Sequence, residues 1–326
     1  MIEGNLCEPI VQGLDGNLAY LTFYLPNFRY FNNPYEEEEE PRDIFDDFIP
    51  IRLTIKFDKW RIIIANPEKA SDTESRLRSQ GGYALNHHCK IERIDRGIFS
   101  VGDVRDLLEA LSYYLSFARG IWTAPMIMMG FNTEGTKVWE EWSTCKADSW
   151  QNVGSWCDFT SCYDLVKAFP GFMRRWEDKN WRALVKESVH WYIEVNKKYG
   201  GVNAAIALQQ IALERLAWAF LVDDKRAINP GGFEKLPAAD KIKLLLTMLN
   251  IELEIPDRAT KLLEKSKEYN WNTGPDAIAE IRNAIVHYNP KRRDRSGSDE
   301  VRDEACGLGL KYLGMVLLKL FDCPQA

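Results

Sequence analysis

The chain has 326 residues, of which 45% are apolar and 28% charged, the composition of a globular protein with room for two domains. Its formal net charge of −6 argues against a basic nucleic-acid-binding surface spread over the whole protein. The acidity is local, however, because residues 36–48 hold eight acidic residues and one arginine, which leaves the rest of the chain near +1.

Nothing in the sequence indicates export or membrane insertion. The first residues lack the basic and apolar regions of a secretory signal. We expect no membrane-spanning helix, which needs a run of about 18 apolar residues. The longest candidate for such a run, 308–321, is interrupted by two lysines. The seven cysteines are scattered without a Cys-x-x-Cys pair, which favours reduced thiols. These features predict a cytoplasmic protein without a membrane partner.

The amino-terminal half reads as a β-rich domain with at least one long helix, over residues 1–180. Residues 51–57 alternate apolar and polar side chains, as a half-buried strand does, and Asp58-Lys59 predicts a hairpin to the next strand. Ser100 followed by Asp103 predicts the capped start of a helix that ends at Gly120. Polar residues 67–82 predict a flexible connection. The expected strands are 18–25, 51–57, 60–65, 83–94, 121–130, 137–142 and a short candidate at 153–156.

The carboxy-terminal half, residues 181–326, reads as an all-α helical bundle. Helical periodicity recurs there, and Gly and Pro separate the segments. Short connections between such helices predict antiparallel neighbours, as in a helical bundle. A β-rich half followed by a helical half makes the expected fold class α+β. The expected helices are 181–199, 202–222, 238–249, 257–269, 275–288 and 299–321.

Candidate catalytic residues occur together in one stretch of the sequence, at the end of the helix that Pro275 begins. Asn283 and His287 are four residues apart, so they share a helix face, and Arg282 borders it. A histidine can transfer protons near neutral pH, and a guanidinium can grip phosphate. Together they suit metal-free cleavage of a phosphodiester, although the arginine–histidine spacing alone is a weak signal.

The Arg282-Asn283-x-x-x-His287 pattern, near the end of the penultimate helix, resembles the signature of HEPN domains over residues 181–323. The resemblance implies a homodimer through the helical domain, in which two motifs face each other across one RNA-cutting cleft. It implies a metal-independent endoribonuclease that leaves 2′,3′-cyclic phosphate ends and needs no cofactor. Arg282 and His287 would be catalytic, and Asn283 would orient them. Some members of this family are non-catalytic binding modules, and that alternative stays open.

Residues beside the motif are candidates for RNA binding. Lys291, Arg292 and Arg293, continued by Arg295, can hold phosphates, and Tyr288 can stack on a base. A solvated loop and ordinary core packing are the corresponding structural alternatives. Glu214 is a candidate partner for Arg282, or an ordinary exposed glutamate.

The amino-terminal half loosely resembles the leading domain of ApeA-type anti-phage HEPN proteins, through the helix ending at residues 115–120 and the tryptophan-rich strands after it. That resemblance implies a sensor or restraining domain, with a phage-derived trigger or an antitoxin as partner. In the alternative, this half recognises a ligand for a non-enzymatic protein. We expect no metal site at His87-His88-Cys89, because adjacent strand residues point to opposite faces.

Overall fold

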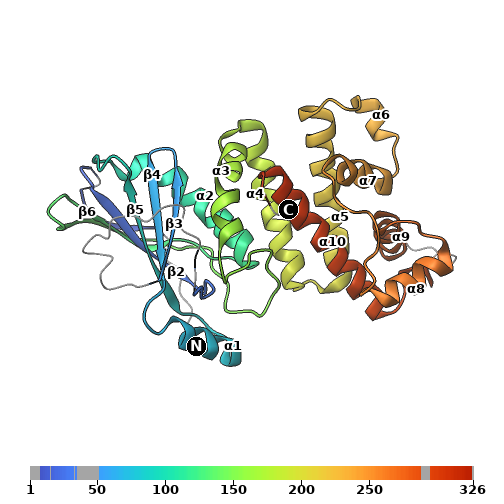
Figure 1. The fold of residues 1–326 in the computed structure, drawn as a ribbon, viewed down its shortest axis with the longest axis horizontal. Coiled ribbons are helices and arrows are strands. Elements are labelled where there is room, and N and C mark those ends of the chain that lie inside the picture. Colours follow the sequence, from blue (N-terminus) through green and yellow to red (C-terminus); the bar gives the residue numbers. More distant parts are fainter. Residues whose placement is uncertain (1–7, 15, 33, 35–50, 288–293, 325–326) are drawn as a thin grey trace. The chain divides into compact units, whose positions relative to one another are not determined.

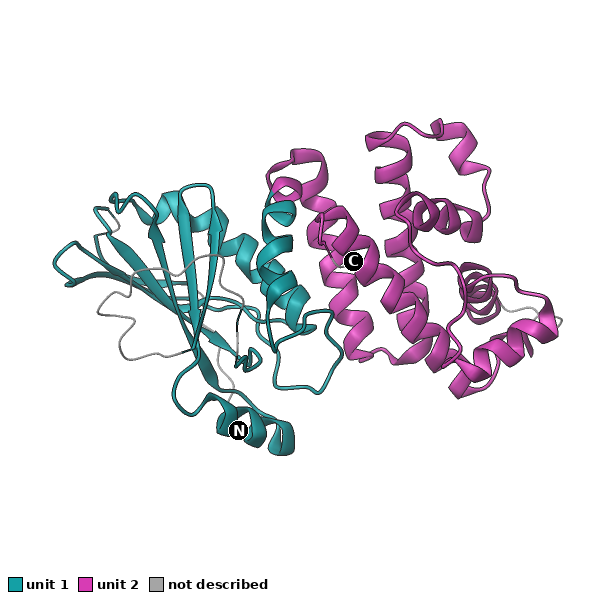
Figure 2. Ribbon diagram, in the orientation of Figure 1, with its two compact units in different colours: residues 1–173, 325 teal, residues 174–324, 326 magenta. Residues whose placement is uncertain are grey.

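A computed structural model describes residues 8–324 except 15, 33, 35–50 and 288–293. The chain divides into two compact units, with the boundary between Met173 and Arg174 (Figure 2). This boundary lies inside helix α3 (Tyr163–Glu177), whereas the sequence placed it near residue 180. A sheet dominates the first unit and helices make up the second, so the α+β class is confirmed.

The first unit is built on a seven-stranded sheet in which every pair of neighbouring strands is antiparallel (Figure 1). The strand order is β1-β7-β6-β2-β5-β4-β3. In chain order the strands are β1 (Ile10–Gly13), β2 (Tyr20–Pro26), β3 (Arg52–Phe57), β4 (Trp60–Ala65), β5 (Leu85–Arg93), β6 (Met126–Phe131) and β7 (Lys137–Trp142).

The predicted hairpin between β3 and β4 is confirmed. Phe57 pairs with Trp60 across a two-residue turn, in which Asp58 has a positive φ of 51°. Leu53 and Ile55 are fully buried, whereas their polar neighbours are partly exposed. The alternation in the sequence therefore sets which face of β3 enters the core.

Helix α2 (Val101–Arg119) forms where its caps predicted it. Ser100 and Asp103 make the reciprocal capping box, and Gly120 closes the helix in the left-handed conformation. Arg105 donates to Glu141 at 2.7 Å, which ties α2 to strand β7.

Two expectations for the first unit are wrong. The stretch 67–82, expected to be a flexible connection, contains helix α1 (Ala70–Gln80). Its buried Ala70, Glu74 and Leu77 lie at helical spacing, a face too short and too polar to stand out in sequence. Residues 153–156 form no strand; they belong to a loop whose Ser155 bonds to the carbonyl of Ala118.

The second unit is helical, with α5 in contact with α4, α7, α9 and α10. Helix α5 continues into a π-helical segment, Ala219–Asp224. The described helices are α4 (Lys179–Lys197), α5 (Gly201–Trp218), α6 (Pro230–Glu234), α7 (Ala238–Met248), α8 (Thr260–Tyr269), α9 (Gly274–Val286) and α10 (Asp299–Leu320).

The segment Gly201–Asp224 is long and apolar enough to cross a membrane by length and composition alone, but Gln209, Gln210, Glu214 and Arg215 interrupt its apolar residues. In the structure 61% of its apolar window is buried, which is how the central helix of a bundle behaves. Its apolar length is therefore used for packing against the four helices around it.

Candidate functional site

Helix α9 carries the candidate residues and is fixed at both its start and its sides. Thr273 caps its amino end by accepting from the Asp276 N–H and donating to the Asp276 carboxylate at 2.8 Å. Lys243 of α7 lies 2.5 Å from the same carboxylate. Ile278 and Ile281 are buried, and the helix packs against α5, α7 and α10. The start and middle of α9 are therefore anchored in the helical unit, and its last turn continues from them.

Arg282 and Asn283 are joined within that last turn. The Arg282 Nη1 donates to Oδ1 of Asn283 at 3.2 Å, and both residues are half-buried. The Arg282 Nε is buried and has no hydrogen-bond partner within the described part of the chain. Burying a guanidinium N–H without a partner destabilises a fold, which makes this position a candidate for function.

His287 lies just outside the helix. The sequence predicted a helix through residue 288, but α9 ends at Val286 and His287 has an extended backbone, with φ −105° and ψ 107°. Its N–H still bonds to the carbonyl of Asn283 at 3.0 Å, and its side chain is exposed. The helical hydrogen-bond pattern of α9 therefore extends to the His287 N–H, and the imidazole beyond it is exposed to solvent.

The neighbouring charges are partly paired. Arg295 forms an ion pair with Glu280 of α9, and its guanidinium carbon lies 5.6 Å from the Tyr269 ring centroid. Glu214 accepts from Gln210 at 2.8 Å and lies 3.6 Å from Lys241. The ion pair that it makes is therefore with α7 rather than with Arg282. Tyr288, Lys291, Arg292 and Arg293 lie outside the described residues.

The side chains at the His-His-Cys sequence of β5 point as strand geometry requires. His87 is buried against Phe28 and Phe31, with ring centroids 5.3 and 5.4 Å apart. His88 stacks on Tyr24 instead, at 5.0 Å. No group of three potential metal-binding side chains occurs among the residues that the structure describes. The six described cysteines carry free thiols.

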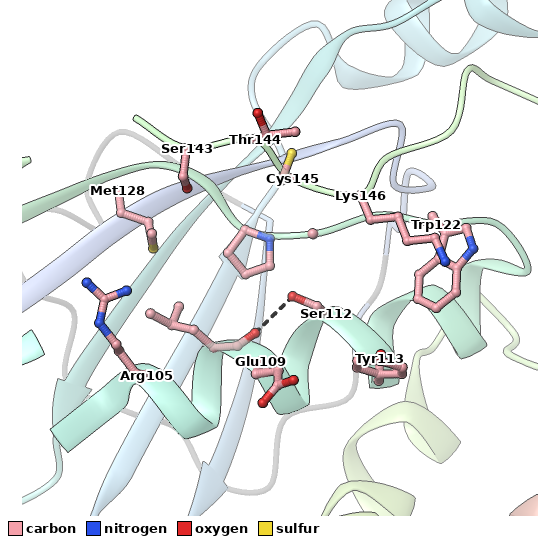
Figure 3. A pocket seen from close by; sticks show the side chains of 13 residues that line it. Arg105, Glu109, Ser112, Tyr113, Trp122, Met128, Ser143, Thr144, Cys145 and Lys146 are labelled. Carbon is pink, nitrogen blue, oxygen red and sulfur yellow. Dashed lines mark hydrogen bonds between the residues drawn. The ribbon is translucent and has the colours of Figure 1, made fainter. Parts of the chain in front are cut away.

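The first unit contains a pocket that the sequence did not reveal (Figure 3). Its volume is about 490 Å³, within the range of small-molecule sites. It lies between α2 and the chain that follows β7, and the Lys146 Nζ is 3.5 Å from the Trp122 ring centroid at one end. Arg105, Glu109, Tyr113 and Cys145 are among its lining residues. Arg105, Glu109 and Tyr113 lie one helical turn apart along α2, and the fold brings Cys145 to them from the chain after β7.

These features describe an α+β protein with a sheet unit, a helical unit and a candidate Arg-Asn-His site at the end of α9. Residues 14–153 match the family model of the YopA central domain, and residues 178–324 match that of the YopA C-terminal domain.

The chain is also similar to the SPbeta prophage-derived uncharacterized protein YopA of Bacillus subtilis strain 168, with 29% identity over 270 residues. That match covers 82% of this chain but spans about 60% of the length of the relative. No solved structure is significantly similar to this chain.

Proposed function

We propose that the chain is a metal-independent, HEPN-type endoribonuclease and that Arg282, Asn283 and His287 form its catalytic half-site. The observation that carries the proposal is the connection of all three residues through Asn283. Its side-chain oxygen accepts from Arg282, and its backbone carbonyl accepts from His287. A half-buried guanidinium and an exposed imidazole are thereby carried five residues apart at the same helix end.

The proposed reaction is an internal transesterification of RNA. The ribose 2′-oxygen attacks the adjacent phosphorus as its proton leaves, and the bond from phosphorus to the 5′-oxygen breaks as that oxygen gains a proton. The products are a 2′,3′-cyclic phosphate and a 5′-hydroxyl. His287 would transfer protons, and Arg282 would stabilise the added negative charge on the phosphoryl oxygens.

One arginine and one histidine supply only half of the groups that the two ends of this reaction need. We therefore propose a homodimer through the helical unit, with the two α9 ends facing one cleft. Lys291, Arg292, Arg293 and Tyr288 remain candidates for binding the RNA on either side of it.

A role in conflict between phages and their hosts fits the similarity to a prophage-derived protein. In this proposal the protein is a cytoplasmic toxin, and the first unit restrains it until a phage-derived trigger or the loss of an antitoxin releases it. The free thiols of all six described cysteines agree with a reducing compartment.

A non-catalytic interaction module is the second candidate. It is favoured by the 490 Å³ pocket of the first unit, which is large enough for a small-molecule ligand. In that case the helical unit would pair with another chain, and Arg282 and Asn283 would serve the packing of α9.

The two candidates are separated by incubating the full chain with total RNA in EDTA, with and without phage-infected lysate. The test variant is the double replacement Arg282→Ala, His287→Ala. The matched control is Arg258→Ala, His190→Ala, which removes one exposed arginine and one exposed histidine elsewhere in the same unit. Cleavage by wild type and control but not by the test variant supports the ribonuclease. Cleavage by none of them, or by all three equally, favours the interaction module.

A further inference from the structure

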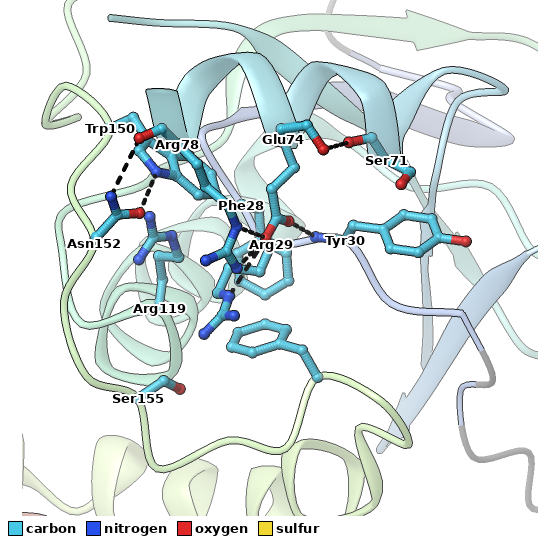
Figure 4. A network of polar contacts seen from close by, with 12 residues as sticks. Phe28, Arg29, Tyr30, Ser71, Glu74, Arg78, Arg119, Trp150, Asn152 and Ser155 are labelled. Carbon is cyan, nitrogen blue, oxygen red and sulfur yellow. Dashed lines mark hydrogen bonds and ion pairs between the residues drawn. The ribbon is translucent and has the colours of Figure 1, made fainter. Parts of the chain in front are cut away.

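Three arginines of the first unit gather around one small pocket, far in sequence from one another (Figure 4). Arg29 follows strand β2, Arg78 belongs to α1, and Arg119 is the last residue of α2. The pocket has a volume of about 140 Å³ and is also lined by Trp150 and residues 151–153. This is below the roughly 300 Å³ at which pockets for whole small molecules begin, so it suits a single compact group.

The positive charge in this cluster exceeds the negative charge that it contains. Glu74 accepts from Arg78 at 2.5 and 2.9 Å and lies 3.8 Å from Arg29, while its second oxygen accepts from the Tyr30 N–H. One buried carboxylate therefore serves two arginines. Among the described residues the acceptors of Arg119 are two backbone carbonyls, those of Asn27 at 2.8 Å and Gln151 at 3.0 Å.

Arg119 is 1% exposed, so its charge is removed from water without a carboxylate to balance it. Burial and the charges of Arg29 and Arg78 lower the pKa of Arg119 to about 9, and Glu74 acts in the opposite direction. The side chain still carries its proton at neutral pH. Its surroundings lack one negative charge, which a bound anion would supply.

The walls of the pocket are held in place by hydrogen bonds. The Arg119 guanidinium carbon lies 4.3 Å from the Trp150 ring centroid, and the Trp150 indole N–H donates to Asn152 at 3.1 Å. Asn27 donates to the carbonyls of Gly82 and Asp148, which fixes the loop that carries Trp150. Because the guanidinium donors and the walls are already ordered, the pocket loses little conformational entropy when a ligand binds in it.

We propose that Arg29, Arg78 and Arg119 form a binding site for a phosphate group, either as free phosphate or as the terminal phosphate of a mononucleotide. The exposed sides of Arg29 and Arg78 form its entrance, and Arg119 forms its floor against Trp150. The binding measurement below does not depend on the proposed ribonuclease activity, so the two proposals can fail separately.

The test is calorimetric titration of the full chain in chloride buffer with inorganic phosphate, adenosine 5′-monophosphate and adenosine. We expect saturable binding of both phosphates at one site per chain and none of adenosine. Tighter binding of the monophosphate identifies a nucleotide as the source of the group, whereas equal affinity identifies the phosphate alone. Absence of saturable binding by either phosphate at millimolar concentration, or equal binding of adenosine, overturns the proposal.

The variants place the binding at this pocket. Arg78→Gln, alone and with Arg29→Gln, should weaken phosphate binding by about tenfold or more, since each removes a charge-assisted donor. Arg76→Gln is the matched control, because it removes the same charge from an exposed position on the same helix. Equal affinity of Arg78→Gln and Arg76→Gln would contradict the proposal. Phosphate should also raise the thermal midpoint of wild type more than that of a folded Arg78→Gln protein.

Discussion

Arg282 donates a hydrogen bond from Nη1 to Oδ1 of Asn283, its neighbour in helix α9, at 3.2 Å. The carbonyl of the same asparagine accepts the backbone N–H of His287 at 3.0 Å, where the helix ends. The asparagine thus contacts both residues to which we assign chemistry. It is the natural position at which to separate positioning from catalysis.

Replacing Asn283 tests that positioning role. Asn283→Ala removes the acceptor for Arg282, and we expect RNA cleavage to fall by about tenfold or more because the guanidinium loses its orientation. Asn283→Asp keeps an oxygen acceptor and should restore much of the rate. The measurement is the cleavage rate of each variant at saturating RNA, with thermal unfolding as a check of the fold. A rate that is the same in all three proteins would show that Asn283 does not position Arg282.

The buried histidine of β5 makes a prediction about acid stability. Burial lowers the pKa of His87 from 6.5 to about 3, and neither ring nitrogen has a hydrogen-bond partner within the described residues. Between these two pKa values the His87 imidazole is therefore protonated in the unfolded chain and neutral in the folded chain. Stability is fully present above pH 6.5 and is lost as pH falls, by about 2 kcal/mol between pH 7 and pH 5.

Urea unfolding of wild type and His87→Phe at pH 7 and pH 5 measures this contribution. The variant keeps a ring in the aromatic core but cannot take up a proton, so its loss of stability should be smaller by the amount given above. His190→Gln, which replaces an exposed histidine of the other unit, controls for the loss of a histidine outside the aromatic core. An identical pH dependence of wild type and His87→Phe would rule out this role.

Local patterns were sufficient for most of the fold. The alternation in β3 and the Ser100 to Gly120 caps of α2 predicted those elements, because each depends on neighbours in sequence. Helix α1 was missed, since its buried face includes Glu74, whose burial depends on Arg78 and on the Tyr30 N–H. Such partners lie in the three-dimensional fold and leave no periodic signal in the sequence.

For the candidate site, the residues remain a prediction from the sequence, and the structure adds their geometry. The order Arg282, Asn283, His287 is visible in sequence, yet the end of α9 at Val286 is not. The two pockets described above were missed for a different reason. Residues such as Arg29 and Arg119 are ninety positions apart and meet only through the sheet.

The packing of α5 against α10 predicts opposite effects for two glycines of one helix. A Cβ added at Gly309 would lie 2.2 Å from the buried Gln209 amide, whereas one added at Gly307 meets nothing within 4 Å. We expect Gly309→Ala to destabilise the protein by about 1–3 kcal/mol through overpacking. Gly307→Ala should stabilise it by about 0.4–1 kcal/mol through helix propensity. Thermal unfolding of both variants measures these changes in stability. Equal changes in the two variants would show that the Gln209 side chain moves aside without cost.

The dimer of the proposed function is open to a direct test. Light scattering should give twice the chain mass at micromolar concentration, and a monomer would count against a shared cleft. Adding an excess of Arg282→Ala, His287→Ala chains to wild-type chains should lower the activity per wild-type chain, because a mixed dimer holds only one Arg282 and one His287. Activity per wild-type chain that stays unchanged in this excess would contradict a composite site.

The measurement closest to the central claim is the chemistry of the RNA ends. The full chain is incubated with RNA in EDTA, and the products are analysed by mass spectrometry. We expect 2′,3′-cyclic phosphate ends, and a rate lower by about 10² or more in both Arg282→Ala and His287→Ala, with Arg258→Ala unchanged. Ends that carry a 3′-hydroxyl, or equal rates in wild type and His287→Ala, would contradict the account.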